Sequence, residues 1–211
     1  MFGAKKLFIF DLDGTLADVY KAIYSSLNYT REKLGYSGVS FPEVKRSVGT
    51  GDINFIAHFF LKRDRRQALA IYRARHKRDV WLYSRPLPGA LAAMRRLKRS
   101  GKIVAVASNR PRLYARKVIE KTGLDRYVDF ALSADQINSL KPKPKILNLI
   151  VKKFGFRKKE AIYFGDMDID METARRAGID AVFVRGGSGG AAPGARYRIL
   201  AVVNRVGEIK L

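Results

Sequence analysis

Acidic and polar side chains directly follow three apolar runs of the sequence. These are residues 5–10 with Asp11 and Asp13, residues 103–107 with Ser108 and Asn109, and residues 161–164 with Asp166 and Asp170. A single acid after a strand is often only a helix cap or a turn residue. If the runs are parallel strands, however, their carboxyl ends meet and several carboxylates share one pocket. Two like charges about 4 Å apart repel by about 4 kcal/mol at an effective dielectric of 20, and a bound divalent cation offsets that repulsion.

An oxygen-rich pocket of this kind predicts Mg²⁺ as the cation, because Mg²⁺ prefers oxygen ligands and completes its octahedron with water and substrate phosphate. His58 and His76 are not needed as ligands, and we expect both to be partly buried or surface residues of a helical segment. The run from Asp166 to Asp170 does not form a calcium loop, since Met171 stands where that loop requires glycine.

Two lysines lie in a proline-restricted turn. Residues 141–144 read Lys-Pro-Lys-Pro, and each proline limits the backbone around it. A lysine ammonium is a compact positive charge that suits phosphate. The turn therefore adds a candidate phosphate contact to the acidic pocket.

Strands and helices alternate along most of the chain. Besides the three runs above, the pattern predicts short strands near residues 130–131 and 181–184, and helices over residues 90–99, 113–121, 145–154 and 172–177. Such alternation indicates an α/β fold, a doubly wound parallel sheet with helices on both faces. The sequence Gly-Gly-Ser-Gly-Gly at residues 186–190 predicts a flexible loop.

The helical pattern between the first and second strands is too long for a simple crossover. We therefore expect a small, all-helical cap domain at residues 17–85, inserted into a core made of residues 1–16 and 86–211. Insertion next to Asp11 would place this cap over the pocket. Its Gly49-Thr50-Gly51 segment is only a weak dinucleotide signal, because no strand precedes it and the third glycine is missing.

The charge balance is strongly basic, with 42 Lys and Arg against 19 Asp and Glu and a formal net charge of +23. This field favours anionic partners such as phosphorylated metabolites, and it allows non-specific binding of polyanions. The alternative is that many of these charges only keep helix faces in contact with solvent.

No cysteine is available as a nucleophile or metal ligand. No apolar run approaches the roughly 18–20 residues that span a bilayer, so we expect no membrane partner and a cytoplasmic location.

The ordered set of motifs resembles the haloacid dehalogenase superfamily, in the branch of phosphoglycolate phosphatase-like enzymes. The four motifs are Asp11-Leu12-Asp13-Gly14-Thr15-Leu16, then Ser108, then Lys141 in a Lys-Pro-x-Pro setting, then Gly165-Asp166-x-x-x-Asp170 running into Ala174-x-x-Ala177-Gly178. One Asp-x-Asp-Gly-Thr motif is moderately specific. Four motifs in the family's order are a strong match, and they span most of the chain outside the expected cap.

The resemblance implies a catalytic role for two of these acids. Asp11 would attack phosphorus, while Asp13 would protonate the leaving oxygen and later activate water. It also implies phosphate contacts from Ser108, Asn109 and Lys141. The implied Mg²⁺ ligands are Asp11, the backbone carbonyl of Asp13, Asp166 and, directly or through water, Asp170.

Other positions refine this expectation. Dehalogenase members do not place an acid at the position of Asp13, so cleavage of a carbon–halogen bond is not expected. The segment Gly49, Thr50 and Gly51 resembles the glycine-containing loop by which such caps contact substrate. Arg110-Pro111 stands where related enzymes often carry Lys-Pro, and we expect this difference to leave the core mechanism untouched.

The leading hypothesis is therefore a phosphatase that acts on a small phosphorylated metabolite. One alternative is a phosphomutase of the same fold, which passes the phosphoryl group to a sugar hydroxyl instead of water. Another is a nucleic-acid-associated protein, suggested by basic clusters at residues 73–78, 95–99 and 157–159. Tyr72 and Trp81 flank the first cluster and could stack bases, although we expect both to pack in the cap. The sequence makes no prediction of oligomeric state.

Overall fold

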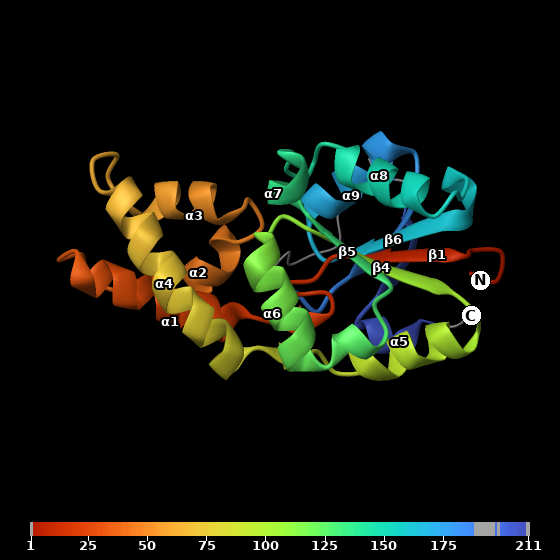
Figure 1. Ribbon diagram of the computed structural model, residues 1–211, viewed down its shortest axis with the longest axis horizontal. Coiled ribbons are helices and arrows are strands. Elements are labelled where there is room, and N and C mark those ends of the chain that lie inside the picture. Colours follow the sequence, from red (N-terminus) through yellow and green to blue (C-terminus); the bar gives the residue numbers. More distant parts are fainter. Residues whose placement is uncertain (1, 188–196, 198, 210–211) are drawn as a thin grey trace.

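The centre of the molecule is a six-stranded parallel sheet with the strand order β5-β4-β1-β6-β7-β8 (Figure 1). The computed structural model describes residues 2–187, 197 and 199–209. The strands are β1 (Leu7–Phe10), β4 (Ile103–Ser108), β5 (Phe130–Ser133), β6 (Ala161–Gly165), β7 (Asp180–Val184) and β8 (Ile199–Val203). The parallel α/β fold expected from the sequence is confirmed.

Helices cover both faces of the sheet, as a doubly wound fold requires (Figure 1). They are α5 (Ala90–Arg99), α6 (Arg112–Thr122), α7 (Ala134–Ile137), α8 (Lys145–Lys153) and α9 (Asp168–Ala177), with 3-10 turns η1 (Leu124–Arg126), η2 (Lys158–Glu160) and η3 (Val206–Glu208). Successive side chains of a strand point to opposite faces. Phe8 and Phe10 of β1 belong to one core cluster, which includes Met94 of α5. Leu7 and Ile9 belong to a second cluster with residues of α8 and α9.

A separate group of helices lies at one end of the sheet (Figure 1). It contains α1 (Tyr20–Lys33), α2 (Phe41–Ser47), α3 (Asp52–Phe59) and α4 (Arg65–Tyr83), which we call the helical lobe. The chain enters and leaves the lobe through β2 (Ala17–Asp18) and β3 (Arg85–Pro86). These two short strands pair antiparallel, a pairing that the helical pattern of residues 17–85 did not predict.

Strand β8 at the edge of the sheet was also not predicted. Its side chains alternate between half-buried and exposed, with Leu200 and Val202 facing solvent. This edge strand therefore lacks the continuous apolar run of a strand that is buried on both faces. Of the predicted flexible loop at 186–190, Gly186 and Gly187 form a turn and bend after β7, and residues 188–190 lie outside the described residues.

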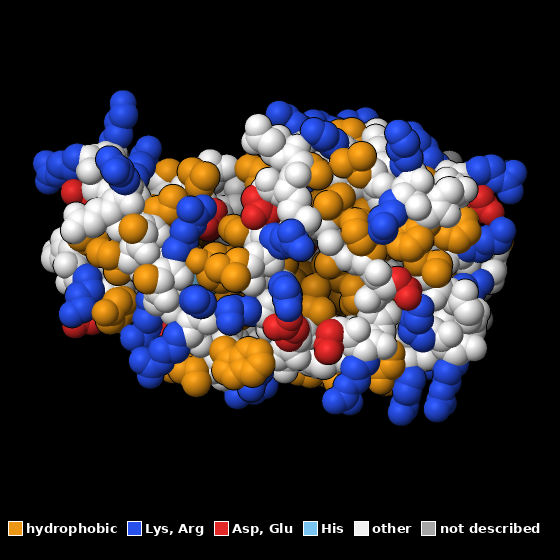
Figure 2. All heavy atoms as spheres, in the orientation of Figure 1, with side chains coloured by type: hydrophobic (Ala, Val, Ile, Leu, Met, Phe, Trp, Pro, Cys, Tyr) orange, Lys and Arg blue, Asp and Glu red, His pale blue; other side chains and the backbone are white. Residues whose placement is uncertain are grey.

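Basic side chains are spread over the surface rather than gathered in one patch on the face that Figure 2 shows. Tyr72 is buried as expected, but the expectation for Trp81 is wrong, because 47% of it is exposed. The ammonium groups of Lys117 and Lys121 lie 5.9 and 5.3 Å from the centre of its ring. None of the helices in the described ranges is both long enough and apolar enough to cross a membrane.

Candidate active site

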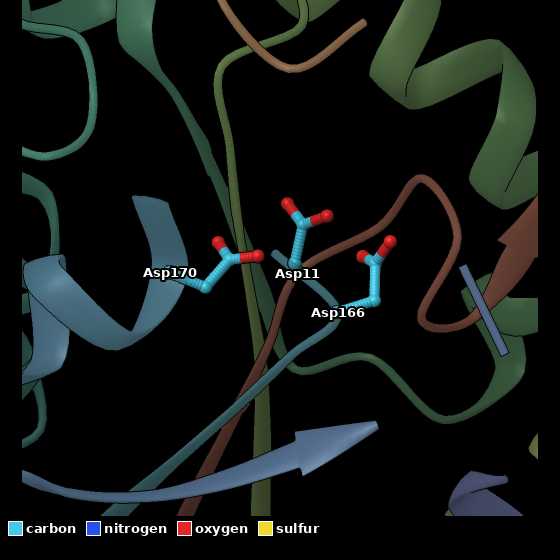
Figure 3. Close-up of side chains that lie close together, drawn as sticks. All are labelled: Asp11, Asp166 and Asp170. Carbon is cyan, nitrogen blue, oxygen red and sulfur yellow. The ribbon is translucent and has the colours of Figure 1, made fainter. Parts of the chain in front are cut away.

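Two segments at the carboxyl ends of the neighbouring strands β1 and β6 bring the acidic side chains together. Asp11 follows β1, and Asp166 follows β6, which pairs directly with β1. Asp170 lies in the first turn of α9. Figure 3 shows the three carboxylates close together, with Asp11 on one segment and Asp166 and Asp170 on another. Parallel pairing of β1 and β6 thus converts a separation of more than 150 residues into a shared site.

Asp11, Asp166 and Asp170 form a buried acid cluster that could hold a metal ion. Each offers one carboxylate oxygen, and these three atoms lie within 4.8 Å of one another. All three residues are at most 6% exposed. A dry cluster of three carboxylates repels itself strongly, so its donor set fits a hard divalent cation with oxygen ligands.

The surroundings of Asp11 shift the pKa of its carboxyl group. Burial raises the pKa of the Asp11 carboxyl well above its usual range, and the negative charges of Asp170 and Asp166 add to the shift. The positive charge of Lys141 acts in the opposite direction. The carboxylate form of Asp11 therefore depends on nearby cations.

Lys141 is the cation inside the cluster. Its Nζ lies 2.6 Å from Oδ1 of Asp11 and 2.7 Å from Oδ1 of Asp170. Burial alone would lower the pKa of this ammonium, but the charges of Asp11 and Asp170 outweigh burial and hold the pKa well above its ordinary value. Lys141 therefore stays protonated and provides a positive charge in direct contact with Asp11 and Asp170.

Tyr163 in strand β6 is hydrogen-bonded to both Lys141 and Asp170. Its hydroxyl accepts a hydrogen bond from Nζ of Lys141 at 3.1 Å and donates one to Oδ1 of Asp170 at 2.8 Å. Sequence reasoning missed Tyr163, because an aromatic residue in a buried strand looks like ordinary core. Thr15 was part of a motif without an assigned role, and its hydroxyl donates to Oδ1 of Asp166 at 3.0 Å.

Ser108 is the last residue of β4 and Asn109 follows it, and both border the same cavity as Asp11. The Ser108 hydroxyl accepts the backbone N–H of Arg110 at 3.1 Å. The Asn109 amide oxygen accepts the backbone N–H of Lys141 at 2.7 Å, and its nitrogen donates to the carbonyl of Gly49 at 2.9 Å. Asn109 therefore links the core loop of Lys141 to the helical lobe.

The lobe closes one side of the cavity with its glycine-containing segment. Gly49 and Gly51 line the cavity, whereas Thr50 is not among its lining residues. Gly49 has φ +105°, and a Cβ there would lie only 2.8 Å from Sδ of Met167. The positive φ favours glycine at this position, where the lobe approaches Met167 of the core. The cavity volume is about 70 Å³, several times the roughly 10–15 Å³ that one enclosed water needs on the same measure.

Asp13 also lines the cavity, and its carboxylate pairs with Arg110. Nε of Arg110 donates to both carboxylate oxygens of Asp13, at 3.1 and 2.8 Å. Nη1 of Arg110 lies 2.7 Å from Nε2 of His76 in helix α4. Arg110, which stands where related enzymes often carry lysine, is therefore in direct contact with Asp13. His76 is 1% exposed, so it is more deeply buried than expected.

Comparison with known proteins assigns this fold and site to a class. The family model for haloacid dehalogenase-like hydrolases matches residues 8–184, and the chain belongs to that family. It is a phosphatase, a hydrolase of phosphate monoesters.

Two relatives and one solved structure show which phosphatases this chain is similar to. A phosphoglycolate phosphatase of Rhodobacter capsulatus is 32% identical over 184 residues, covering 82% of this chain and 81% of that protein. One from Aquifex aeolicus is 27% identical, again covering 82% of this chain and 81% of that protein. The crystal structure of a predicted phosphoglycolate phosphatase from Haemophilus somnus has a TM-score of 0.89 at 21% identity, covering 97% of this chain and 96% of that one. That structural similarity supports the fold.

Proposed function

We propose that this protein is a Mg²⁺-dependent phosphatase that hydrolyses small phosphate monoesters through an aspartyl-phosphate on Asp11. The observation that carries the proposal is the buried cluster of Asp11, Asp166 and Asp170 with Lys141 beside it. The cluster borders the cavity that a substrate would enter. Residues 17–85, which include the helical lobe, are proposed as a cap domain over this cavity.

In the first step, a carboxylate oxygen of Asp11 attacks phosphorus and the bond from phosphorus to the leaving oxygen breaks. Asp13 gives its proton to that oxygen, so an alcohol leaves and an acyl phosphate remains on Asp11. Lys141, Ser108 and Asn109 are proposed to hold the phosphoryl oxygens. Electrostatic stabilisation of such oxygens is the main contribution that a protein makes to phosphoryl transfer.

In the second step, water attacks phosphorus of the aspartyl-phosphate while Asp13 accepts a proton from that water. The bond between phosphorus and the Asp11 oxygen breaks, which releases inorganic phosphate and restores both carboxyl groups. Bound Mg²⁺ would supply positive charge that neutralises the transferring phosphoryl group. Its proposed ligands are Asp11, the backbone carbonyl of Asp13, Asp166 and Asp170.

A compact substrate is proposed from the cavity and from the relatives together. The cavity volume is about 70 Å³, which favours a small metabolite over a nucleotide or a polymer. Several relatives are named phosphoglycolate phosphatase. Phosphoglycolate is therefore the first compound to test, beside sugar phosphates and nucleotides.

Removal of divalent metal is expected to abolish activity. The protein would be freed of metal with chelator, checked for residual metal, and assayed for phosphate release from an aryl phosphate and from phosphoglycolate. Turnover should return only when Mg²⁺ is added, because the carboxylates alone lack the positive charge that the transition state needs. Undiminished turnover in the verified metal-free protein would overturn the metal assignment.

Gly187→Ala is expected to weaken Mg²⁺ activation. A Cβ at Gly187 would overlap the carboxylate of Asp166, so the methyl group pushes that side chain out of the acid cluster. Displacing a metal ligand in this way should raise the Mg²⁺ concentration for half-maximal activity by about 10- to 100-fold.

Gly186→Ala is the matched control for this change. A Cβ there would meet only the carbonyl of Asn204, at 3.4 Å, which a small shift accommodates. Titration of activity with Mg²⁺ compares both variants with the wild type. Equal activation curves for the two variants would show that the contact between Gly187 and Asp166 does not set metal affinity.

A further inference from the structure

The side chain of Arg110 connects the acid at Asp13 with the helical lobe. Arg110 follows β4 in the core, Asp13 follows β1, and His76 belongs to helix α4. The guanidinium bonds both carboxylate oxygens of Asp13 through Nε and reaches His76 through Nη1. The Arg110 side chain is only 6% exposed and that of Asp13 23%. One planar cation thus spans core and lobe at the edge of the cavity.

The direction of these hydrogen bonds follows from the chemistry of the groups. A guanidinium only donates, so Nε2 of His76 must accept from Nη1 of Arg110. Burial holds the pKa of His76 well below its usual value, and the nearby charge of Arg110 acts in the same direction. The imidazole is therefore neutral, with its proton on Nδ1. That proton points to the hydroxyl of Ser26, which lies 2.9 Å away in helix α1.

The His76 ring packs between the lobe and the core. It stacks on Tyr72 of α4 with a centroid distance of 4.9 Å and meets the edge of Tyr114 in the core helix α6 at 5.1 Å. Beyond Ser26, the network continues to the fully buried Asp79, whose carboxylate lies 3.2 Å from the Ser26 hydroxyl. A displacement of α4 against the core therefore moves the group to which Arg110 is bonded.

We propose that Arg110 is a positioning residue that holds the Asp13 carboxylate in its working place, and that His76 fixes Arg110 so that this place depends on the seating of the lobe. The inference rests on the proposed function, because it assigns Asp13 the acid–base role. A planar guanidinium suits this task, since it offers rigid donors in two directions at once. An ammonium at the same position would be a single point charge and would lose one of the two connections.

The test uses two pairs of variants with the full chain. Arg110→Met removes the charge and the donors, whereas Arg110→Lys keeps the charge without the planar geometry. His76→Phe keeps an aromatic ring against Tyr72 but loses the acceptor, whereas His76→Gln restores an amide oxygen that can accept from Arg110. Thermal unfolding of each variant identifies any loss of folded protein before kinetics are compared.

The readout is the dependence of kcat/KM on the leaving group. This quantity covers the steps through formation of the aspartyl-phosphate. An alkyl phosphate needs protonation of its leaving oxygen, and an aryl phosphate with a good leaving group hardly does. Misplacing a proton donor by about 1 Å can cost about 10²-fold. We expect Arg110→Met and His76→Phe to lower kcat/KM on the alkyl phosphate by about 10- to 100-fold and on the aryl phosphate by less than about threefold.

Further outcomes separate positioning from other roles. His76→Gln should recover most of the loss, and His76→Phe should add little in an Arg110→Met background, because the two residues act in series. Equal losses on both phosphates would make Arg110 merely structural. A loss confined to KM of substrates with a carboxylate would assign Arg110 to substrate binding. Either result overturns the inference, while metal-dependent phosphate release by the wild type would leave the proposed function intact.

Discussion

Asp11→Asn is expected to abolish both turnover and covalent labelling. The amide is a very poor nucleophile, so no acyl phosphate can form on residue 11. The measurement mixes the variant with ³²P-labelled substrate, quenches in acid and looks for protein-bound, hydroxylamine-sensitive label. Phosphate release should fall to the background of the assay, at least about 10⁴-fold below the wild type if the nucleophile is lost.

The matched control for this experiment is Asp168→Asn. Asp168 is an exposed acid between Asp166 and Asp170 in the sequence, but it is not part of the acid cluster among the described residues. Its variant should label and turn over much like the wild type. Acid-stable label retained by Asp11→Asn would refute Asp11 as the nucleophile.

Asp13→Asn is expected to trap the phosphoenzyme. With Asp11 intact, the variant can still be phosphorylated by an aryl phosphate, whose good leaving group needs little protonation. Hydrolysis of the aspartyl-phosphate then lacks its general base, and such assistance is worth about 10²- to 10⁴-fold per step. The variant should show a burst of phenol followed by slow turnover, with label accumulating on the protein.

An alkyl phosphate provides the internal contrast for Asp13→Asn. Its poor leaving group requires the missing proton, so phosphorylation itself should slow and little label should accumulate. Rapid-quench time courses on both substrates separate these two steps. Wild-type turnover of the alkyl phosphate by this variant would remove Asp13 from the acid–base role, whatever the behaviour of Asp11→Asn.

The fold class and the residues available for chemistry could be predicted from the amino-acid sequence alone. Apolar runs such as residues 103–107 are long enough, and sufficiently uninterrupted by charge, to indicate strands buried on both faces, which only a parallel sheet with helices on both sides provides. Placing Asp11, Ser108 and Asp166 directly after such runs was enough to predict that they share one edge. The rule is geometric, because parallel strands end on the same side of the sheet.

Strand β8 and the exposure of Trp81 were not predicted from the local pattern of apolar residues. At the sheet edge, side chains such as Val202 face solvent, so burial no longer imposes a continuous apolar run. Trp81 follows the basic cluster of helix α4 and reads as a core residue by type alone. In the structure it is 47% exposed, with Lys117 and Lys121 of α6 over its ring.

The hydrogen bonds that orient the side chains of the site could be seen only in the tertiary structure. Tyr163 reads as core in the sequence, yet its hydroxyl bonds both Lys141 and Asp170. Arg110 lies 97 residues from Asp13 and 34 from His76, and no local spacing relates the three. Their meeting depends on how the helical lobe sits on the sheet. That placement depends on packing summed over many weak contacts, whereas the positions of the buried strands and the residue types are properties of short segments and can be read from the sequence.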